Sequence, residues 1–344
     1  MAARKIARRK MLLNLAGGAG AIAAANILSR RARAAEFVFK YGNNTPVTGP
    51  LTIESIAAAK RINEESNGRL EVQVFPDNQL GGDASMLSQI RYGSLEMMHV
   101  AGLVLGTLVP VSSLQGVAFA FTDYDQAWGA MDGELGDLIH RAIEKAGLVA
   151  LRMVWDSGFR EVSSSTHPIN TPADFKDFKI RVPGGPMWVS LFSALGASPV
   201  FIDATQLYTG LKTKLADGAE TSLTVMDLFK FYEVQRYISL TNHQWECHWV
   251  LVNAAAWRKL PEDLQEIVTR NFAKGGQAER EASKKLNNSL RSQMEARGVT
   301  FNTTDPAPFR EALVKAGYYR DWEAKFGAEN WSVLQKYAPG LSRT

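Results

Sequence analysis

The sequence has few of the residues that build most catalytic and metal centres: its 344 residues include one cysteine and five histidines. A lone thiol, Cys247, cannot form an intrachain disulfide, and it leaves no CxxC pair for redox chemistry or for cysteine-bound zinc and iron–sulfur sites. The five-residue step from His243 to His248 fits neither one helix face nor one strand face. We therefore expect no metal and no cofactor, and a fold that depends on its hydrophobic core.

The signatures of several large enzyme classes are also absent. The sequence contains no G-x-S-x-G nucleophile elbow, no H-E-x-x-H metal motif and no G-x-x-x-x-G-K-[ST] phosphate loop. Beyond residue 34 it has no uninterrupted apolar run of the roughly 18 to 20 residues that a membrane helix needs. We expect a protein that is not an enzyme and has no membrane span after residue 34.

Acidic residues are missing from the first 34 positions, which hold eight of the 39 lysines and arginines. Without this segment the formal net charge changes from +4 to −4. The basic character of the chain therefore comes from its start, and it gives no support to nucleic-acid binding.

The first 34 residues have the three parts of an export signal. A basic start is followed by an apolar stretch, Met11–Leu28, and by small residues at Ala32 and Ala34, which predicts cleavage near Ala35 and a periplasmic protein. The Arg8-Arg9 pair indicates twin-arginine export, a route for folded proteins. The alternative is an ordinary secretory signal with two chance arginines.

After the leader, apolar periodicity predicts an α/β fold in which strands and helices alternate. The first helix begins at Pro50 and places Ile53, Ile56, Ala59 and Ile62 on its apolar face. Asp83 is expected to cap a short helix. The other elements expected are strands at 37–41, 70–74, 95–100, 148–155, 179–182 and 249–252, and helices at 125–147, through 188–195 and at 205–218.

One segment is too long for a single compact domain. Residues 262–297 contain no proline, and a continuous helix of these 36 residues is about 54 Å long. Such a helix either crosses two domains or breaks at Gly275 and Gly276, and we favour crossing. A chain of this length also predicts two domains, at about 150 residues each.

Two arginines lie where a charged side chain needs a partner. Arg160 follows an apolar run, and Arg181 lies between Ile180 and Val182 on a short predicted strand. A buried guanidinium is rare unless it is paired, and it binds carboxylates through two parallel hydrogen bonds. The alternative is a structural salt bridge to a local acid such as Asp174 or Asp177.

Three stretches carry a resemblance to a known family: KIRVPGGPMWVSLFSALGASPVFIDATQLYTGLKTKLADGAE, KFYEVQRYISLTNH and LVNAAAWRKLPEDLQEIV. They resemble the solute-binding subunits of TRAP (tripartite ATP-independent periplasmic) transporters of the dicarboxylate, or DctP, type. The resemblance begins near Phe37 and covers most of the chain after the leader, and the segment from Arg181 to His243 is its specific part.

This resemblance implies a periplasmic-binding-protein-like clamp: two α/β domains joined by hinge strands, with a long helix spanning both. It implies that Arg181 clamps a substrate carboxylate and that Arg160 assists. It also implies a sodium-driven membrane partner, made of a small and a large subunit, that receives the ligand.

The sequence departs from the family pattern at the expected pocket. Where the family commonly has Gln-Glu-Asn-Pro, the chain has Ala219-Glu220-Thr221-Ser222, so Thr221 replaces an amide that often contacts the ligand. Ala204 replaces a common aromatic residue. With Trp188 and Trp245 in segments that could reach the pocket, we expect a larger and less polar organic acid, such as an aromatic acid, rather than a small dicarboxylate.

The hypothesis is thus a monomeric periplasmic binding protein for an organic acid, such as an aromatic or a sugar acid. The expected ligand-binding residues are Arg181, Arg160, Thr221, Glu220, Trp188 and Asn44. Domain I is expected at residues 35–157 with about 247–286, and domain II at 158–246 with about 287–344. The expected crossing points are near residues 156–158 and 244–248. The alternatives are a twin-arginine-exported enzyme and a binding protein that serves a sensory receptor.

Overall fold

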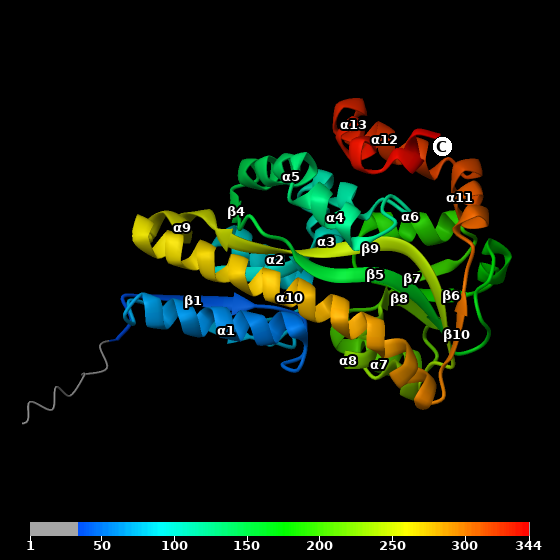
Figure 1. Cartoon of the computed structure of the whole chain (residues 1–344), viewed down its shortest axis with the longest axis horizontal. Helices are drawn as coiled ribbons and strands as arrows, with labels where there is room; N and C mark the ends of the chain where they lie inside the picture. Colours follow the sequence, from blue (N-terminus) through cyan, green and yellow to red (C-terminus); the bar gives the residue numbers. More distant parts are fainter. Residues whose placement is uncertain (1–33, 344) are drawn as a thin grey trace, which may run out of the picture. The chain divides into compact units, whose positions relative to one another are not determined.

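The computed structural model describes residues 34–343. In this part of the chain ten strands form one mixed sheet, in the order β2-β1-β3-β9-β5-β8-β6-β7, with β4 and β10 also paired to β9 (Figure 1). The predicted export signal and its cleavage site lie outside the described residues, so they stay predictions.

The strands alternate with helices along most of the chain, as predicted. The strands are β1 Phe37–Gly42, β2 Leu70–Phe75, β3 Met97–Ala101, β4 Leu148–Ala150, β5 Trp155–Ser164, β6 Lys179–Val182, β7 Ser198–Phe201, β8 Gly218–Ser222, β9 Tyr237–Asn253 and β10 Thr300–Thr303. The helices are α1 Pro50–Glu65, α2 Asp83–Tyr92, α3 Gly102–Leu105, α4 Tyr124–Met131, α5 Glu134–Lys145, α6 Pro186–Ala194, α7 Leu207–Lys212, α8 Leu223–Leu228, α9 Ala254–Lys259, α10 Glu262–Ala296, α11 Pro306–Lys315, α12 Tyr318–Phe326 and α13 Ala328–Tyr337.

The sheet is parallel in its outer parts and antiparallel at its centre. Strand β1 pairs in parallel with β2 and β3, and β6 pairs in parallel with β7 and β8. Between these groups β9 runs antiparallel to β3 and to β5, and β5 runs antiparallel to β8. Two long antiparallel strands, β5 and β9, therefore join the two parallel parts of the sheet.

Strands β5 and β9 belong to both halves of the sheet. One end of β9, residues 248–253, pairs with β3 and β4, whereas its other end, residues 237–240, pairs with β10. The pairing of β5 with β9 shifts register between Asp156 and Gly158 and again between Arg160 and Val162. The first irregularity coincides with the predicted crossing point at residues 156–158, while the domain boundaries themselves stay a prediction.

The long helix is continuous, as favoured from the sequence. Helix α10 has 35 residues and is about 52 Å long. It contacts α1 and β5 along its first part and α8 and β10 further along, and Figure 1 shows it crossing the sheet diagonally. The helix is not broken at Gly275 and Gly276. The two glycines instead allow it to approach Trp155, because a Cβ on Gly275 or Gly276 would lie 3.0 or 2.9 Å from the indole ring.

Several details of the predicted helices are wrong. Ile53 and Ile56 of α1 are exposed, at 49% and 43%, because three-residue steps drift around a helix of 3.6 residues per turn. The buried face instead includes the polar residues Thr52 and Ser55, whose hydroxyls bond to Thr45 and Tyr41. The helix expected at 125–147 is two helices, α4 and α5.

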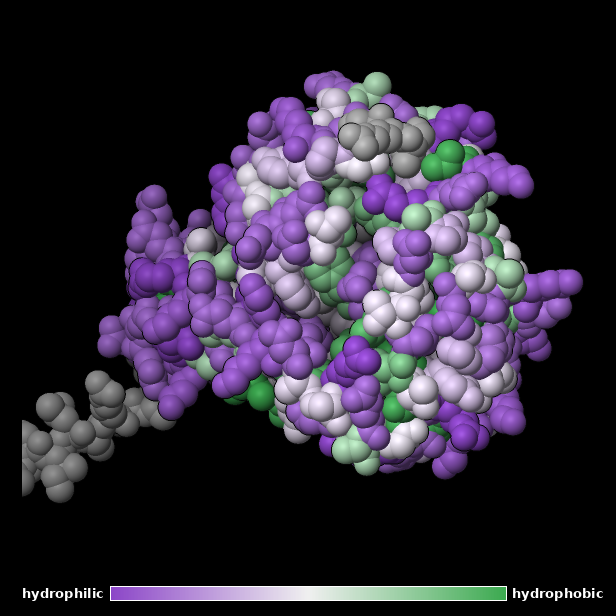
Figure 2. All heavy atoms as spheres, turned by 45° about the vertical axis from the view of Figure 1, so that its right-hand side comes forward, coloured by the Kyte–Doolittle hydropathy of each residue, from purple (hydrophilic) through white to green (hydrophobic). Residues whose placement is uncertain are grey.

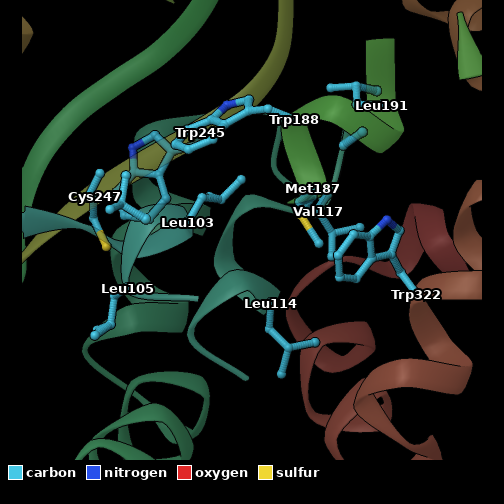
Figure 3. Close-up of a cluster of buried hydrophobic side chains, with 14 of the residues drawn as sticks. Leu103, Leu105, Leu114, Val117, Met187, Trp188, Leu191, Trp245, Cys247 and Trp322 are labelled. Atoms are coloured by element: carbon cyan, nitrogen blue, oxygen red, sulfur yellow. The ribbon is translucent and has the colours of Figure 1, made fainter. Parts of the chain in front are cut away.

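The hydrophobic core joins segments that are far apart in the sequence. Figure 3 shows buried side chains from three such segments, among them Leu103, Trp188 and Trp322. The aromatic residues of the C-terminal helices also pack into this core, with Tyr318, Trp322 and others buried. On the face drawn in Figure 2, hydrophilic residues dominate, and hydrophobic ones are scattered or lie in the hollow near the centre.

Two glycines, one in α4 and one in α10, should respond differently to replacement by alanine. Gly129 of α4 has open space where a Cβ would lie, so Gly129→Ala should stabilise the protein by about 1 kcal/mol through helix propensity. Gly276→Ala should give no such gain, because its Cβ would lie 2.9 Å from the buried Trp155 Nε1. Chemical denaturation measures both, and equal stabilisation would show that α10 does not press on Trp155.

Candidate functional site

A cavity of about 390 Å³ lies between the two parallel parts of the sheet. Its walls come from the start of α2, α3, β5, the β6–α6 turn, the segment after β7, the end of β8, and α8. Most of these segments begin at the carboxyl ends of parallel strands, which is where α/β sheets place their ligand sites. The lining residues are Asn44, Thr45, Asp83, Ala84, Ala101, Val104, Thr107, Ser157, Arg160, Arg181, Pro183, Gly184, Gly185, Pro186, Trp188, Val189, Phe201, Asp203, Ala204, Leu207, Thr221, Val225, Phe229 and His248.

Arg181 brings a buried positive charge to this cavity. The residue is 4% exposed, and its Nε donates to the Ile202 carbonyl at 2.8 Å. No carboxylate of residues 34–343 lies within ion-pair distance of its guanidinium, so the alternative of a salt bridge to Asp174 or Asp177 is wrong. Burial lowers the pKa of Arg181 to about 10. It is a desolvated cation held in place by a single main-chain bond.

Arg160 lies beside it, and its charge is compensated. Its Nε donates to Glu220 Oε2 at 2.5 Å and its Nη2 donates to Glu220 Oε1 at 2.7 Å, a two-pronged carboxylate pair. Its guanidinium also stacks 5.0 Å above the Trp188 ring. Burial opposes the charge of Arg160, but Glu220 outweighs it and raises the pKa of Arg160.

Glu220 lies behind Arg160 rather than on the cavity wall, although the sequence suggested a ligand contact. Its carboxylate accepts from Arg160 and lies 3.3 Å from His243 Nε2, and the residue is fully buried. Burial alone would raise the pKa of Glu220, but Arg160 and His243 hold it below the usual value. The geometry makes Glu220 a residue that positions Arg160.

The structure brings most of the other predicted residues to the cavity. Asn44, Thr221 and Trp188 all line it, and Trp188 is at the same time fully buried. Trp245 does not line it: its indole lies behind the wall and donates to Asp156 Oδ1 at 2.8 Å. A ligand role for any of these residues stays a prediction.

Two acidic residues of the cavity were missed by sequence analysis. Asp83 was assigned to helix capping, but the cap position belongs to Gly82, and the Asp83 carboxylate accepts from Asn44 Nδ2 at 2.9 Å. Burial is the largest cause that raises the pKa of Asp83 to about 6, and the nearby Asp203 adds to it. Asp203 follows β7, so the position of both acids after strands β2 and β7 was a signal that could have found them.

A small cavity of about 20 Å³ adjoins the main one and shares Thr45, Ser157, Val225 and His248 with it. There the Asp156 main-chain N–H donates to Glu279 Oε2 at 2.7 Å, which ties β5 to α10. The neighbouring Arg280 does not pair with either acid, since it binds Asp132 at 2.7 and 2.8 Å. Burial raises the pKa of both Asp156 and Glu279.

Residues 34–343 contain neither a metal-binding cluster nor a helix suited to span a membrane. No three His, Cys, Asp or Glu side chains in this range are grouped so that they could hold a metal ion. Within the same residues, no helix is long and apolar enough to cross a membrane.

Comparison with known proteins places the chain among transport proteins. The family model for bacterial extracellular solute-binding proteins, family 7 (DctP), matches residues 42–323. The 2,3-diketo-L-gulonate-binding periplasmic protein YiaO of Escherichia coli is 33% identical over 261 residues, which are 74% of this chain and 79% of that protein.

Solved structures agree in fold. A TRAP periplasmic solute-binding protein of Sulfurospirillum deleyianum with bound succinate has a TM-score of 0.82 and 28% identity, over 88% of this chain and 99% of that one. Another, of Roseobacter denitrificans with bound L-galactonate, has a TM-score of 0.81 and 27% identity, over 89% and 99% of the two chains. The sequence resemblance to this group is thereby confirmed, and so is the clamp-like α/β fold.

The buried acid pair predicts how stability depends on pH. The raised pKa of Glu279 means that the folded state keeps a proton which the unfolded chain loses above its usual pKa of 4.5. The stability that this protonated carboxyl contributes should therefore be lost as the pH rises from about 5 to 8. Glu279→Gln is neutral at every pH and can still accept from Asp156, so its melting temperature should fall less over this range.

The control for this substitution is Glu295→Gln, which removes an exposed acid from the same helix. It should show the same pH dependence as the unchanged protein. If Glu279→Gln also keeps the full pH dependence, Glu279 is already ionised in the folded protein.

Proposed function

We propose that this chain, which belongs to the DctP family of bacterial extracellular solute-binding proteins, binds an organic acid through Arg181 and delivers it to the membrane subunits of a TRAP transporter. The family consists of solute-binding proteins rather than enzymes. The relatives with named ligands bind acids: 2,3-diketo-L-gulonate, succinate and L-galactonate. The periplasmic location of the named relatives supports the same location here.

The observation that carries this proposal is the unpaired charge of Arg181. A buried cation without an anion is costly, and a ligand carboxylate removes this cost by accepting from the guanidinium. Nε already bonds to Ile202, so the terminal nitrogens remain to face the ligand. Each charge-assisted bond contributes about 1.5 to 3 kcal/mol where water is excluded.

Arg160 has a different part in this proposal. Because Glu220 and Trp188 fix its guanidinium, Arg160 offers a rigid donor beside the carboxylate without adding an uncompensated charge. Thr221, the last residue but one of β8, lies on the same wall and offers a hydroxyl. The carboxylate is thus expected to meet Arg181 as its counter-ion and Arg160 and Thr221 as orienting donors.

Ligand entry requires the two halves to move apart. They share β5, β9 and α10, so the change in backbone angles is expected at a few residues of the two strands. The register shift at residues 156–158 marks one such place, and residues 244–248 of β9 lie beside it. We therefore propose domains at 35–157 with about 247–286 and at 158–246 with about 287–344, and we further propose that the protein is a monomer.

Replacing Arg181 tests the site. Arg181→Ala should weaken binding of the best ligand among succinate, galactonate and 2,3-diketo-L-gulonate by at least tenfold in titration calorimetry, while the thermal unfolding of the free protein stays cooperative. Arg181→Lys keeps the charge but loses the paired N–H donors of the guanidinium. Its affinity should therefore lie between that of the unchanged protein and that of Arg181→Ala.

The matched control is Arg152→Ala, because Arg152 is exposed and pairs with Asp137 away from the cavity. It should leave affinity unchanged. An unchanged affinity in Arg181→Ala would place the carboxylate elsewhere and refute the proposed site.

Motion can be tested separately. A ligand that contacts both halves stabilises the closed form, so saturating ligand should reduce the radius of gyration in solution scattering. The fluorescence of Trp155, Trp245 or Trp249, all buried near the crossing strands, should change as well. Identical scattering curves with and without ligand would mean that the pocket is rigid.

A further inference from the structure

We propose that the cavity selects acids with a single carboxylate and rejects dicarboxylates, because Asp83 and Asp203 line it together with Arg181, a cation that has no ion-pair partner among residues 34–343. This inference rests on the proposed function and adds the charge and the character of the ligand. The expected ligand is a monocarboxylate with a hydrocarbon body and a hydroxyl group at a distance from the carboxylate.

The first step is the count of positive charges on the wall. The basic residues among the described lining residues are Arg160, Arg181 and His248. Glu220 compensates Arg160 through two short hydrogen bonds. Burial, with a smaller contribution from Arg160, lowers the pKa of His248 to about 3, so this ring is neutral. One positive charge, that of Arg181, is left for a ligand.

The second step is the position of the acids. Asp83 begins α2 in one half, and Asp203 follows β7 in the other. They lie close to each other: a Cβ on Gly82, the residue before Asp83, would be 2.6 Å from Asp203 Oδ2. Both acids interact electrostatically with Arg181. Once a carboxylate occupies Arg181, a second one would meet two like charges and no free cation on this wall.

The third step is the unmet hydrogen-bonding capacity of Asp83. Its Oδ2 accepts from Asn44, but its Oδ1 is shielded from solvent and has no partner within the described residues. A shielded carboxylate oxygen needs a donor, which a second ligand carboxylate cannot supply when it is ionised. A ligand hydroxyl can supply it.

The fourth step is the character of the remaining wall. Much of it is apolar, with the larger aliphatic and phenyl side chains coming from Val104, Val189, Phe201, Leu207, Val225 and Phe229. Ala204 and Thr221 are small, so they leave room for the ligand body. A hydrocarbon body can be buried against such a wall without losing hydrogen bonds to water. The inner hydroxyls of a sugar acid would lose such bonds and need partners on the wall.

Matched acids that differ in one group test the inference. Three series are titrated by calorimetry at pH 8, where Asp83 is ionised: hexanoate, 6-hydroxyhexanoate and adipate; 4-methylbenzoate, 4-(hydroxymethyl)benzoate and terephthalate; and galactonate against galactarate. In the series that binds best, the monocarboxylate should bind at least tenfold more tightly than the dicarboxylate. The hydroxylated member should bind more tightly than its methyl analogue.

Two variants connect this preference to the acids. Asp203→Asn and Asp83→Asn keep the side-chain shape and remove one charge each, so each should reduce the preference for the monocarboxylate at least threefold. Asp137→Asn, which removes an exposed acid outside the cavity, should leave the preference unchanged. Thermal unfolding of each variant checks that it is folded.

The outcomes separate this inference from the proposed function. If dicarboxylates bind as tightly as monocarboxylates, or if the preference survives both Asp substitutions, the inference is wrong while the carboxylate site at Arg181 stands. If galactonate binds more tightly than every acid of the two hydrocarbon series, the inference that the ligand has a hydrocarbon body is wrong. If Arg181→Ala leaves all affinities unchanged, the proposed function itself fails.

Discussion

The site depends on how the protein buries two guanidinium groups at one cavity. Desolvation and mutual repulsion both disfavour such a pair, and the pKa of Arg181 is lowered for these reasons. The protein itself compensates the charge of Arg160. Glu220 accepts two hydrogen bonds from its guanidinium, which also stacks on the Trp188 ring. The charge of Arg181 has no ion-pair partner among residues 34–343, and in the proposed function a ligand carboxylate supplies that partner.

The rest of the fold keeps that arrangement in position. Arg160 lies on β5 and Glu220 on β8, and the antiparallel register of these strands places Arg160 opposite Ser222, two residues from Glu220. Arg181 lies on β6, which pairs with β8 on its other side. Three adjacent strands thus carry the whole charged cluster, and the wall opposite it is supplied by α2 and α3. Because α10 and β9 contact both halves, the two walls remain parts of one framework.

The comparison of sequence and structure is most informative where they differ. Spacing identified α10 but could not explain its glycines, because their reason is the distance to Trp155, a residue more than a hundred positions away. Three-residue periodicity chose Ile53 and Ile56 as the buried face of α1, whereas the buried hydroxyls of Thr52 and Ser55 are satisfied by partners on other segments. A pattern of apolar residues cannot report such bonds, since they depend on which polar groups meet.

By itself the sequence determined the alternation of strands and helices and the length of α10, and it singled out Arg181 as a charged residue that needs a partner. Each of these follows from local periodicity, from capping residues or from the rarity of a charged residue in an apolar strand. The tertiary structure decided that Arg160 is paired and Arg181 is not, that Glu220 lies behind the wall, and that Asp83 and Asp203 face the same cavity. These are properties of distance between residues on different strands, and only the register of the folded sheet fixes those distances.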